Sequence, residues 1–268
     1  MGKDGSLRQY FSDLNTHVNI ERIPFQNDSI RYIQTGQDRD SIPTLLFIHG
    51  APGNLDNFKT YLADIDLKSE FRLVSMDRLG YGDSDFGNSE TDLAVQAKAA
   101  VEVLNSFSSS EVYLISHSYG CPIAAKLVID NPGLIDGLIM CAPLNDPEAE
   151  PVEWYSYIAN TSYMRLLLPE FVNVASDEKM NHKASLRKIE NDWQRISSPV
   201  LHIHGKKDGL APFQANIDFS KKKIPSEFLY LDEQKDMGHL LIWMDAGYIK
   251  NRILSFIEEC RNREGISL

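Results

Sequence analysis

Short apolar runs, each about the length of one β-strand, recur along most of the chain. Residues 44–48 form a continuous apolar run, which is typical of a strand buried on both faces. Before it, segments 17–25 and 29–35, separated by a turn-rich tripeptide, predict two strands with no helix between them. Further apolar runs predict strands at 71–76, 112–115, 134–141, 199–203 and 227–231.

Helical periodicity fills intervals between these strands. Apolar residues repeat at helical spacing over 93–107, 123–129 and 248–260. Buried strands that alternate with helices indicate a mostly parallel sheet with helices on both faces, and the two leading strands suggest an antiparallel edge. We therefore expect an α/β fold with a twisted sheet of about eight strands, built as one domain over residues 1–268.

The segment 145–188 breaks this alternation, because it contains no run typical of a buried strand. It is too short for a core of its own, so we expect a small helical lid inserted into the domain. The alternative is an irregular excursion that is packed on the domain without covering a site. The segment is rich in large apolar side chains: Trp154, Tyr155, Tyr157, Tyr163, Met164, Leu166, Leu167, Leu168 and Phe171.

Composition and charge restrict the partners. The formal net charge of -11 argues against nucleic acid, because phosphates are bound by clustered Lys and Arg. A small-molecule substrate is expected instead, and the oligomeric state stays open. No apolar stretch approaches the ~18 residues of a membrane span, and no signal-peptide core follows the first residues. We expect a cytoplasmic protein, unless a native leader was removed.

A serine motif directly follows the predicted strand at 112–115. The segment 116–120, Ser-His-Ser-Tyr-Gly, lies between that strand and a helical pattern, which is the context of a nucleophile elbow. The sharp turn needs small residues two positions to either side of the nucleophile. Gly120 meets this need, and Ser116 is small although glycine is usual there. We expect Ser118 to be the nucleophile, with the positive end of the next helix directed at it.

A resting serine hydroxyl needs a neighbouring base, and histidine suits this role because its pKa lies near working pH. His239 follows a glycine in a loop before the last predicted helix, so its side chain can project over the sheet. Asp208 follows the strand at 199–203, at the sheet edge where catalytic groups collect, and would orient the base. Asp146, which also follows a strand, is the alternative acid.

Residues 49–53, His-Gly-Ala-Pro-Gly, form a glycine-rich turn directly after the strand at 44–48. Acyl transfer builds negative charge on a carbonyl oxygen, and each preorganised N–H donor can stabilise it by ~3–4 kcal/mol. Glycine lets the backbone approach closely enough. We expect the backbone N–H groups of Ala51 and Tyr119 to form this oxyanion hole.

Taken together, these motifs resemble those of the α/β-hydrolase superfamily over nearly the whole chain. Residues 49–53 resemble its oxyanion loop, 77–84 (Asp-Arg-Leu-Gly-Tyr-Gly-Asp-Ser) its loop after the fourth strand, and 116–120 its elbow. Asp208 resembles the acid loop and His239 the base loop, in the chain order Ser, Asp, His. The resemblance implies a serine hydrolase, and a serine nucleophile excludes the mechanisms of the dehalogenases and epoxide hydrolases of the family.

Several subclasses share this set of residues. An esterase or related acyl hydrolase with an apolar group in its substrate is the first expectation, because the insertion is aromatic. The oxyanion loop also resembles that of prolyl aminopeptidases, whose acidic cap residues would correspond to Glu148, Glu150 or Glu153 here. Carbon–carbon bond hydrolases and cofactor-free haloperoxidases use the same triad. An inactive family member that acts as a binding protein is a further alternative, although no triad residue is missing.

No metal or organic cofactor is expected. His202 and His204 share one face of a predicted strand, and such a pair can bind a metal ion. No carboxylate partner for them is evident in the sequence, so we do not predict a metal site. The three cysteines, Cys121, Cys141 and Cys260, have no CxxC spacing and predict neither a zinc site nor a disulfide framework.

Overall fold

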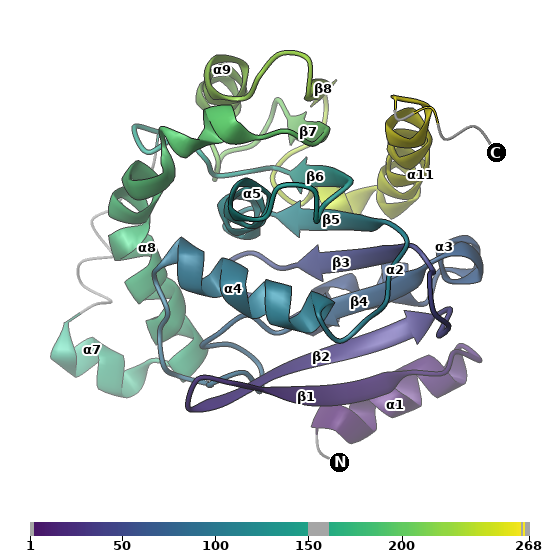
Figure 1. Ribbon diagram of the computed structural model, residues 1–268. Coiled ribbons are helices and arrows are strands. Elements are labelled where there is room, and N and C mark those ends of the chain that lie inside the picture. The colour runs from purple at the N-terminus through teal and green to yellow at the C-terminus, as the bar shows by residue number, and fades with distance from the viewer. Residues whose placement is uncertain (1–2, 150–160, 264, 266–268) are drawn as a thin grey trace.

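The computed structural model describes residues 3–149, 161–263 and 265, and its centre is one eight-stranded sheet (Figure 1). The strand order is β1-β2-β4-β3-β5-β6-β7-β8. β1 and β2 are antiparallel to their neighbours, and every other pair is parallel. The strands are β1 (Asn19–Phe25), β2 (Asp28–Gly36), β3 (Thr44–Ile48), β4 (Arg72–Met76), β5 (Val112–His117), β6 (Gly137–Cys141), β7 (Val200–Gly205) and β8 (Leu229–Gln234).

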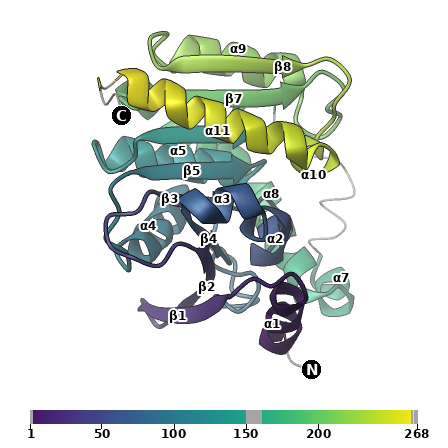
Figure 2. The ribbon, with the colours of Figure 1, turned by 90° about the vertical axis from the view of Figure 1, so that its right-hand side faces the viewer.

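Helices cover both faces of this sheet. Figure 2 shows α11, α2 and α3 on one face, with α4, α5 and α9 behind the strands on the other. The helices are α1 (Lys3–Asp13), α2 (Lys59–Leu62), α3 (Ile65–Glu70), α4 (Leu93–Leu104), α5 (Gly120–Asp130), α7 (Ser162–Leu167), α8 (Glu170–Ile189), α9 (Phe213–Lys223), α10 (Leu241–Met244) and α11 (Ala246–Arg263). Two short 3₁₀ turns, η1 (Leu55–Phe58) and η2 (Asp192–Arg195), complete the described elements.

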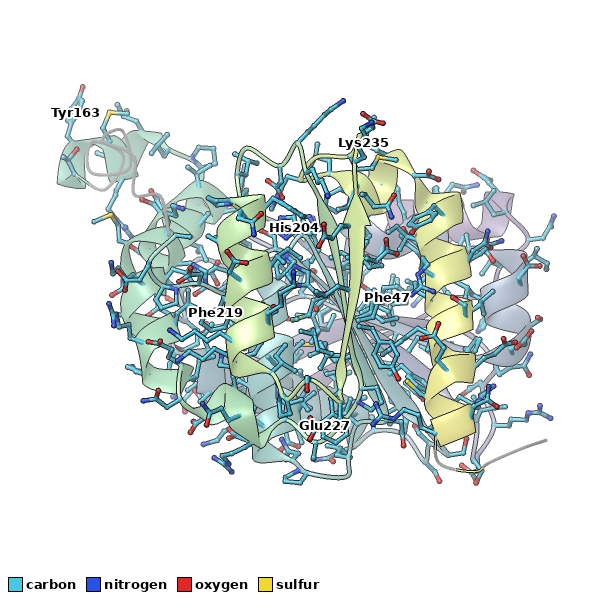
Figure 3. All side chains as sticks on the ribbon, turned by 90° about the horizontal axis from the view of Figure 1, so that it is seen from above. Phe47, Tyr163, His204, Phe219, Glu227 and Lys235 are labelled. Carbon is cyan, nitrogen blue, oxygen red and sulfur yellow. The ribbon has the colours of Figure 1, made fainter. Side chains whose placement is uncertain are left out.

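Alternate residues of one strand feed two separate hydrophobic cores. In β3, Leu46 and Ile48 pack with α4 and α5, whereas Leu45 and Phe47 pack with α1 and α11. Figure 3 shows Phe47 and Phe219 on opposite sides of the sheet. Side chains of a strand alternate between its faces, so a strand covered twice must be apolar at every position. The fold class expected from the continuous apolar runs is confirmed.

Some predicted boundaries were wrong. The strand expected at 134–141 begins only at Gly137, because Leu134 closes the turn after α5 with a bond from its N–H to the oxygen of Asn131. The strand expected at 227–231 continues to Gln234 through polar residues, which an edge strand with partly exposed side chains tolerates. The N-terminal helix α1 was not predicted, because its few apolar residues give a weak helical stripe.

The described part of the expected insertion is helical. α8 is 20 residues long and buries Val174 and Leu186. In Figure 1, α7 and α8 lie on the left, the side toward which the parallel strands point. Residues 150–160, which include Trp154, Tyr155, Tyr157, Glu150 and Glu153, lie outside the described residues. A lid role for this segment stays a prediction.

Candidate active site

Ser118 lies on the tight turn between β5 and α5. Its backbone φ of 54° is in the left-handed region, which a residue other than glycine adopts at a cost of about 1–3 kcal/mol. The turn is held by bonds from the Ser118 N–H to the Cys141 oxygen and from the Cys121 N–H to the Ser118 oxygen, both 3.0 Å. Backbone strain that surrounding bonds enforce in this way is typical of a nucleophile elbow.

The two positions that flank Ser118 at a distance of two residues hold small residues for different physical reasons. A Cβ at Gly120 would lie 2.6 Å from the backbone oxygen of Ile48, so α5 can begin this close to β3 only with glycine there. Ser116 is fully buried and donates its hydroxyl to the oxygen of Ile139 at 3.0 Å, which anchors the end of β5 to β6. The serine therefore uses its polar group in the place where glycine is usual.

The structure brings Ser118, His239 and Asp208 together from three separate loops. His239 Nε2 lies 3.0 Å from the Ser118 hydroxyl oxygen, and His239 Nδ1 lies 2.8 Å from Asp208 Oδ2. An ionised carboxylate only accepts hydrogen bonds, so the Nδ1 atom donates and the Nε2 lone pair faces the serine. That arrangement is the one a histidine needs to take a proton from the serine hydroxyl.

The Asp208 carboxylate accepts four hydrogen bonds. Its Oδ2 accepts hydrogen bonds from His239 Nδ1 and, at 3.1 Å, from His204 Nε2. Its Oδ1 accepts from the N–H groups of Leu210 and Ala211 at 2.9 and 2.8 Å. Burial alone would raise the pKa of Asp208, but the bonds from His204 and His239 hold it well below its ordinary value. Asp208 is therefore ionised at neutral pH.

Asp146, the alternative acid, has different partners. Its carboxylate accepts the Glu148 N–H at 2.9 Å, and its own N–H donates to the side chain of Asn216 at 3.1 Å. The geometry therefore pairs Asp208, and not Asp146, with His239.

His117 is a buried neighbour of the base. Its ring contacts those of His239 and Trp243, with centroid distances of 4.8 and 4.6 Å, and its Nε2 donates to the backbone oxygen of His239 at 2.9 Å. Burial lowers the pKa of His117 to about 3, and the nearby charge of His239 acts in the same direction. The ring is thus neutral at working pH and fixes the backbone of the base loop.

The loop at 49–53 lies directly against the elbow. A Cβ at Gly50 would lie 3.0 Å from the Ser118 Cβ, so a larger residue would push the loop away from the nucleophile. The peptide bond between Ala51 and Pro52 is cis. Tyr119, the other expected donor, is the N-cap residue of α5, next to Ser118.

A buried arginine holds the loop at 49–53. Arg78 donates from Nε to the oxygen of His49 at 2.9 Å and from Nη2 to the oxygen of Gly50 at 3.0 Å. The C=O and N–H of a trans peptide point in opposite directions. Holding the Gly50 oxygen against Arg78 therefore directs the Ala51 N–H away from the arginine, and Ala51 lines the cavity beside Ser118.

The charge of Arg78 is balanced by Glu178 from α8. The two side chains form a forked pair with bonds of 2.5 and 3.1 Å, both are buried, and the Tyr81 hydroxyl donates to Glu178 at 2.7 Å. Burial alone would lower the pKa of Arg78, but Glu178 raises it. Glu178 was not anticipated from the sequence. A signal existed: it lies four residues from both Val174 and His182 in the buried stripe of α8.

His202 and His204 are both buried, and their ring nitrogens are 3.0 Å apart. Within the described ranges, no group of three or more His, Cys, Asp or Glu side chains is arranged to hold a metal ion. Cys121, Cys141 and Cys260 are all buried and form no disulfide, and burial raises the pKa of the Cys121 thiol to about 12. A thiol with this pKa stays protonated and unreactive.

A cavity of about 330 Å³ opens at Ser118. Two of its apolar lining residues are also open to solvent: Leu210 is 63% and Leu240 is 52% exposed. Its lining consists of Gly50, Ala51, Pro52, Asn57, His117, Ser118, Leu210, His239, Leu240 and Trp243.

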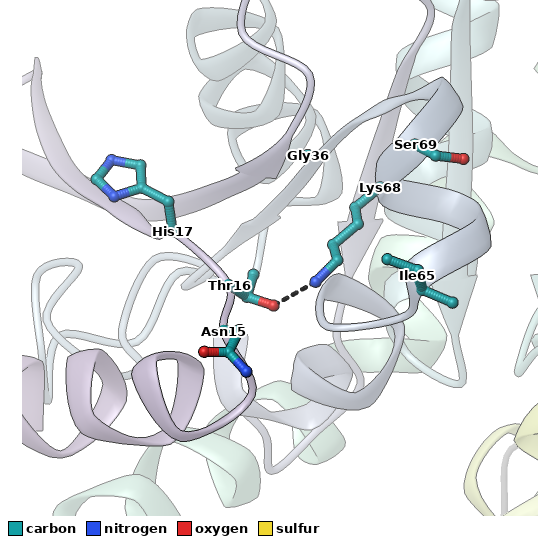
Figure 4. A pocket seen from close by; sticks show the side chains of 7 residues that line it. All are labelled: Asn15, Thr16, His17, Gly36, Ile65, Lys68 and Ser69. Carbon is teal, nitrogen blue, oxygen red and sulfur yellow. Dashed lines mark hydrogen bonds between the residues drawn. The ribbon is translucent and has the colours of Figure 1, made fainter.

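Figure 4 shows a second hollow, of about 260 Å³, near Lys68 and Gly36. Gly36 pairs with Arg72, the first residue of β4, so this hollow lies at the opposite edge of the parallel strands. His17 and Ser69 both line this hollow but bond elsewhere, His17 to Asn19 and Ser69 to the oxygen of Asp66. The hydrogen bond between Lys68 and Thr16 crosses the hollow. Of the two hollows described here, only the cavity at Ser118 contains a serine that is hydrogen-bonded to a histidine.

Comparison with known proteins agrees with this architecture. A family model for the alpha/beta hydrolase fold matches residues 43–178, which is half of the chain, and the chain therefore belongs to that family. It is 26% identical to the lysophosphatidylserine lipase ABHD12 of Danio rerio over 188 residues, covering 66% of this chain. The chain spans 31% to 56% of the length of three curated relatives that it matches, 46% for the lipase.

Solved structures share the fold. A membrane phospholipase A described as a bacterial virulence factor superposes with a TM-score of 0.75 at 19% identity, over 96% of this chain and 91% of that one. Carboxylesterase CesB from Bacillus subtilis superposes with a TM-score of 0.65 at 17% identity, over 95% and 96% of the two chains. Among the described residues of the present chain, no helix is long and apolar enough to cross a membrane.

Proposed function

We propose that the protein is a serine hydrolase that cleaves an ester or related acyl substrate with an apolar group, through an acyl-enzyme. One observation carries this proposal: His239 links the Ser118 hydroxyl, at 3.0 Å, to the ionised carboxylate of Asp208, at 2.8 Å. The hydrolase family to which the chain belongs and its lipase relative support the same chemistry.

In the proposed reaction, His239 takes the hydroxyl proton as Ser118 Oγ attacks the substrate carbonyl. The negative charge that develops on the carbonyl oxygen is stabilised by the N–H groups of Ala51 and Tyr119. His239 then gives the proton to the leaving group, whose bond to the acyl carbon breaks. Water, deprotonated by His239, attacks the acyl-enzyme and releases the acid and Ser118. Asp208 fixes the imidazole tautomer and stabilises the imidazolium.

The surroundings of the cavity favour an apolar acyl or leaving group. Leu210 and Leu240 line the cavity and are exposed, and a substrate chain that covers them would gain about 25 cal/mol for each Å² of apolar surface removed from water. The aminopeptidase alternative gains no support from Glu148, because that side chain is paired with Lys183 and Arg187 on the surface. An alkyl ester is therefore the first substrate to test.

The decisive experiment labels the protein with a fluorophosphonate probe beside a Ser118→Ala variant and identifies the labelled peptide by mass. We expect labelling at Ser118 that disappears in the variant. On p-nitrophenyl esters of increasing chain length, Ser118→Ala and His239→Ala should each reduce turnover on the order of 10⁴–10⁶-fold, and Asp208→Asn somewhat less. A folded protein that is neither labelled nor active would contradict the proposal and favour the binding-protein alternative.

Activity on highly charged substrates alone would contradict the apolar preference while leaving the serine mechanism intact. An Asp208→Asn variant with wild-type turnover would reopen the role of Asp146. The amide keeps the shape of the side chain but cannot hold the imidazolium, so the variant tests charge rather than packing.

A further inference from the structure

The hydrogen bonds of the site continue beyond Asp208 into the core. His204 Nε2 lies 3.1 Å from Asp208 Oδ2, His204 Nδ1 lies 3.0 Å from His202 Nε2, and His202 Nδ1 lies 2.9 Å from the Ser220 hydroxyl. His202 and His204 are on β7 and Ser220 is on α9. Figure 3 shows His204 near the end of the sheet, beside α9. A continuous chain of hydrogen bonds thus runs from Ser118 through His239 and Asp208 to α9, a helix on one face of the sheet.

Asp208 determines which atom donates in each hydrogen bond of this series. His204 Nε2 faces two groups that only accept, the Asp208 carboxylate and the backbone oxygen of Ala211 at 3.1 Å, so Nε2 carries a hydrogen. With neutral rings, His204 Nδ1 then accepts from His202 Nε2, and His202 Nδ1 accepts from the Ser220 hydroxyl. Burial lowers the pKa of His202 well below its ordinary value, as does the neighbouring His204, so His202 is neutral. Every donor therefore points toward Asp208.

The environment makes this chain rigid. His202, His204 and Ser220 are all completely buried, so each polar atom depends on its neighbour in the chain rather than on water. The Asp208 Oδ2 atom consequently has two fixed donors, His204 from the core and His239 from the site. Rotation of the carboxylate would break the bond to His204, together with two backbone bonds on Oδ1.

We propose that His204 is a positioning residue for the catalytic acid: its Nε2–H fixes Asp208 Oδ2 in line with His239 Nδ1 and withdraws part of the negative charge from the base. His202 and Ser220 hold His204 in the tautomer that this requires. The inference rests on the proposed function, since it assigns a role to the support of the proposed triad. It also accounts for the His-x-His pair of β7 without a metal ion.

A consequence for the base follows. A hydrogen bond from His204 draws negative charge from Asp208 Oδ2, so Asp208 pairs less strongly with protonated His239 than it would without that bond. The other titratable groups facing the pair are His117 from β5 and His202. The charged side chains next along the two loops are exposed and paired elsewhere: Lys206 with Glu233 and Lys207 with Asp236.

The test replaces His204 by phenylalanine, which keeps a planar ring but removes the donor, and by glutamine, which can still donate and accept. His17→Gln serves as the control, because His17 is exposed and its side chain bonds to Asn19, away from Asp208 and His239. The titration of His239 is followed by NMR with ¹³C-labelled histidine, which needs no substrate. The rate of fluorophosphonate labelling is measured over the same pH range.

We expect His204→Phe to raise the pKa of His239 by about half a unit to one unit and to slow labelling about 10–100-fold at neutral pH. His204→Gln should restore most of the wild-type His239 titration and labelling rate, and His17→Gln should leave both at their wild-type values. If His204→Phe does not fold, Ser220→Ala, which removes only the far donor, should shift the His239 pKa upward by a smaller amount.

A folded His204→Phe protein with the wild-type His239 titration would overturn the inference, and so would a Ser220→Ala protein with no shift where His204→Phe cannot be measured. If wild-type protein is not labelled at Ser118 but the His239 titration still shifts upward in His204→Phe, the proposed function fails while the positioning of Asp208 by His204 stands.

Discussion

Two regions at the carboxyl edge of the sheet support the site by different physical means. On the acid side, Asp208 is held by a chain of uncharged groups, His204, His202 and Ser220. On the oxyanion side, the loop after β3 is held by Arg78, whose charge is balanced by Glu178 from α8. Both supports are buried, and both connect a loop of the proposed site to a helix on the same face of the sheet.

The difference lies in what each support costs when it is broken. Removing one partner of a buried ion pair leaves a charge in a low-dielectric interior, which typically costs 3–5 kcal/mol. Removing one neutral donor leaves an unsatisfied polar atom, which costs about 1–3 kcal/mol. Damage to the oxyanion side should therefore appear first as lost stability, whereas damage to the acid side should appear first as altered titration and rate.

Breaking the ion pair should produce the largest effect. Glu178→Ala leaves the Arg78 guanidinium buried without its counter-charge, and we expect the free energy of unfolding to fall by about 3–5 kcal/mol. Urea denaturation followed by circular dichroism measures this, with Glu178→Gln as the matched variant that keeps the shape of the side chain and one acceptor oxygen but removes its charge. A loss below about 1 kcal/mol in Glu178→Ala would show that the pair is not the anchor of this side.

Acidification should reduce stability through the neutral histidines while Arg78 keeps its charge. Burial lowers the pKa of His117 to about 3 from an ordinary value of 6.5. Between those values the unfolded chain binds a proton that the folded protein does not, so stability falls as the pH decreases through this window. We expect a loss on the order of a few kcal/mol from pH 6.5 to pH 3, measured by urea denaturation. In His117→Phe the free energy of unfolding should depend less steeply on pH between 6.5 and 3. An unchanged pH dependence in this variant would contradict the role given to His117.

Two glycine substitutions compare the loops themselves. A Cβ at Gly50 would lie 3.0 Å from Ser118 Cβ, whereas a Cβ at Gly209, next to Asp208, would have no atom within 4 Å. Gly50→Ala should displace the oxyanion loop and reduce kcat/KM about 10–100-fold, because small misplacements of catalytic groups are costly. Gly209→Ala should keep turnover within about twofold of wild type. Equal losses in both variants would remove the distinction between the loops.

The smallest effect is expected for charges at the surface. Lys207 and Asp236 form an ion pair on the acid and base loops, with side chains 64% and 75% exposed. Lys207→Ala should change the free energy of unfolding by less than about 0.5 kcal/mol, because water and salt screen such a pair. Urea denaturation in low and high salt checks this. A loss of unfolding free energy comparable to that of Glu178→Ala would contradict the claim that burial determines how much an ion pair contributes to stability.

The sequence by itself determined the class of fold and the position of each motif in it. Strand-length patterns predicted eight strands, and the structure has all eight. The five strands β3 to β7 are buried at every position, because helices cover both of their faces. The small residues around Ser118 predicted a tight turn for a steric reason that involves only near neighbours and one adjacent strand. The catalytic roles of Ser118, His239 and Asp208 stay predictions that the Ser118 experiments test.

Only the tertiary structure decided which side chains support the motifs. Glu178 lies 100 positions from Arg78, and Ser220 lies 18 positions from His202, so no local pattern could pair them. The choice of Asp208 over Asp146 as the partner of His239 also needed the loops to be placed in space. Apolar periodicity is a property of neighbours along the chain. The pairing of buried polar groups depends on how helices pack against the sheet, which the sequence specifies only through the complete fold.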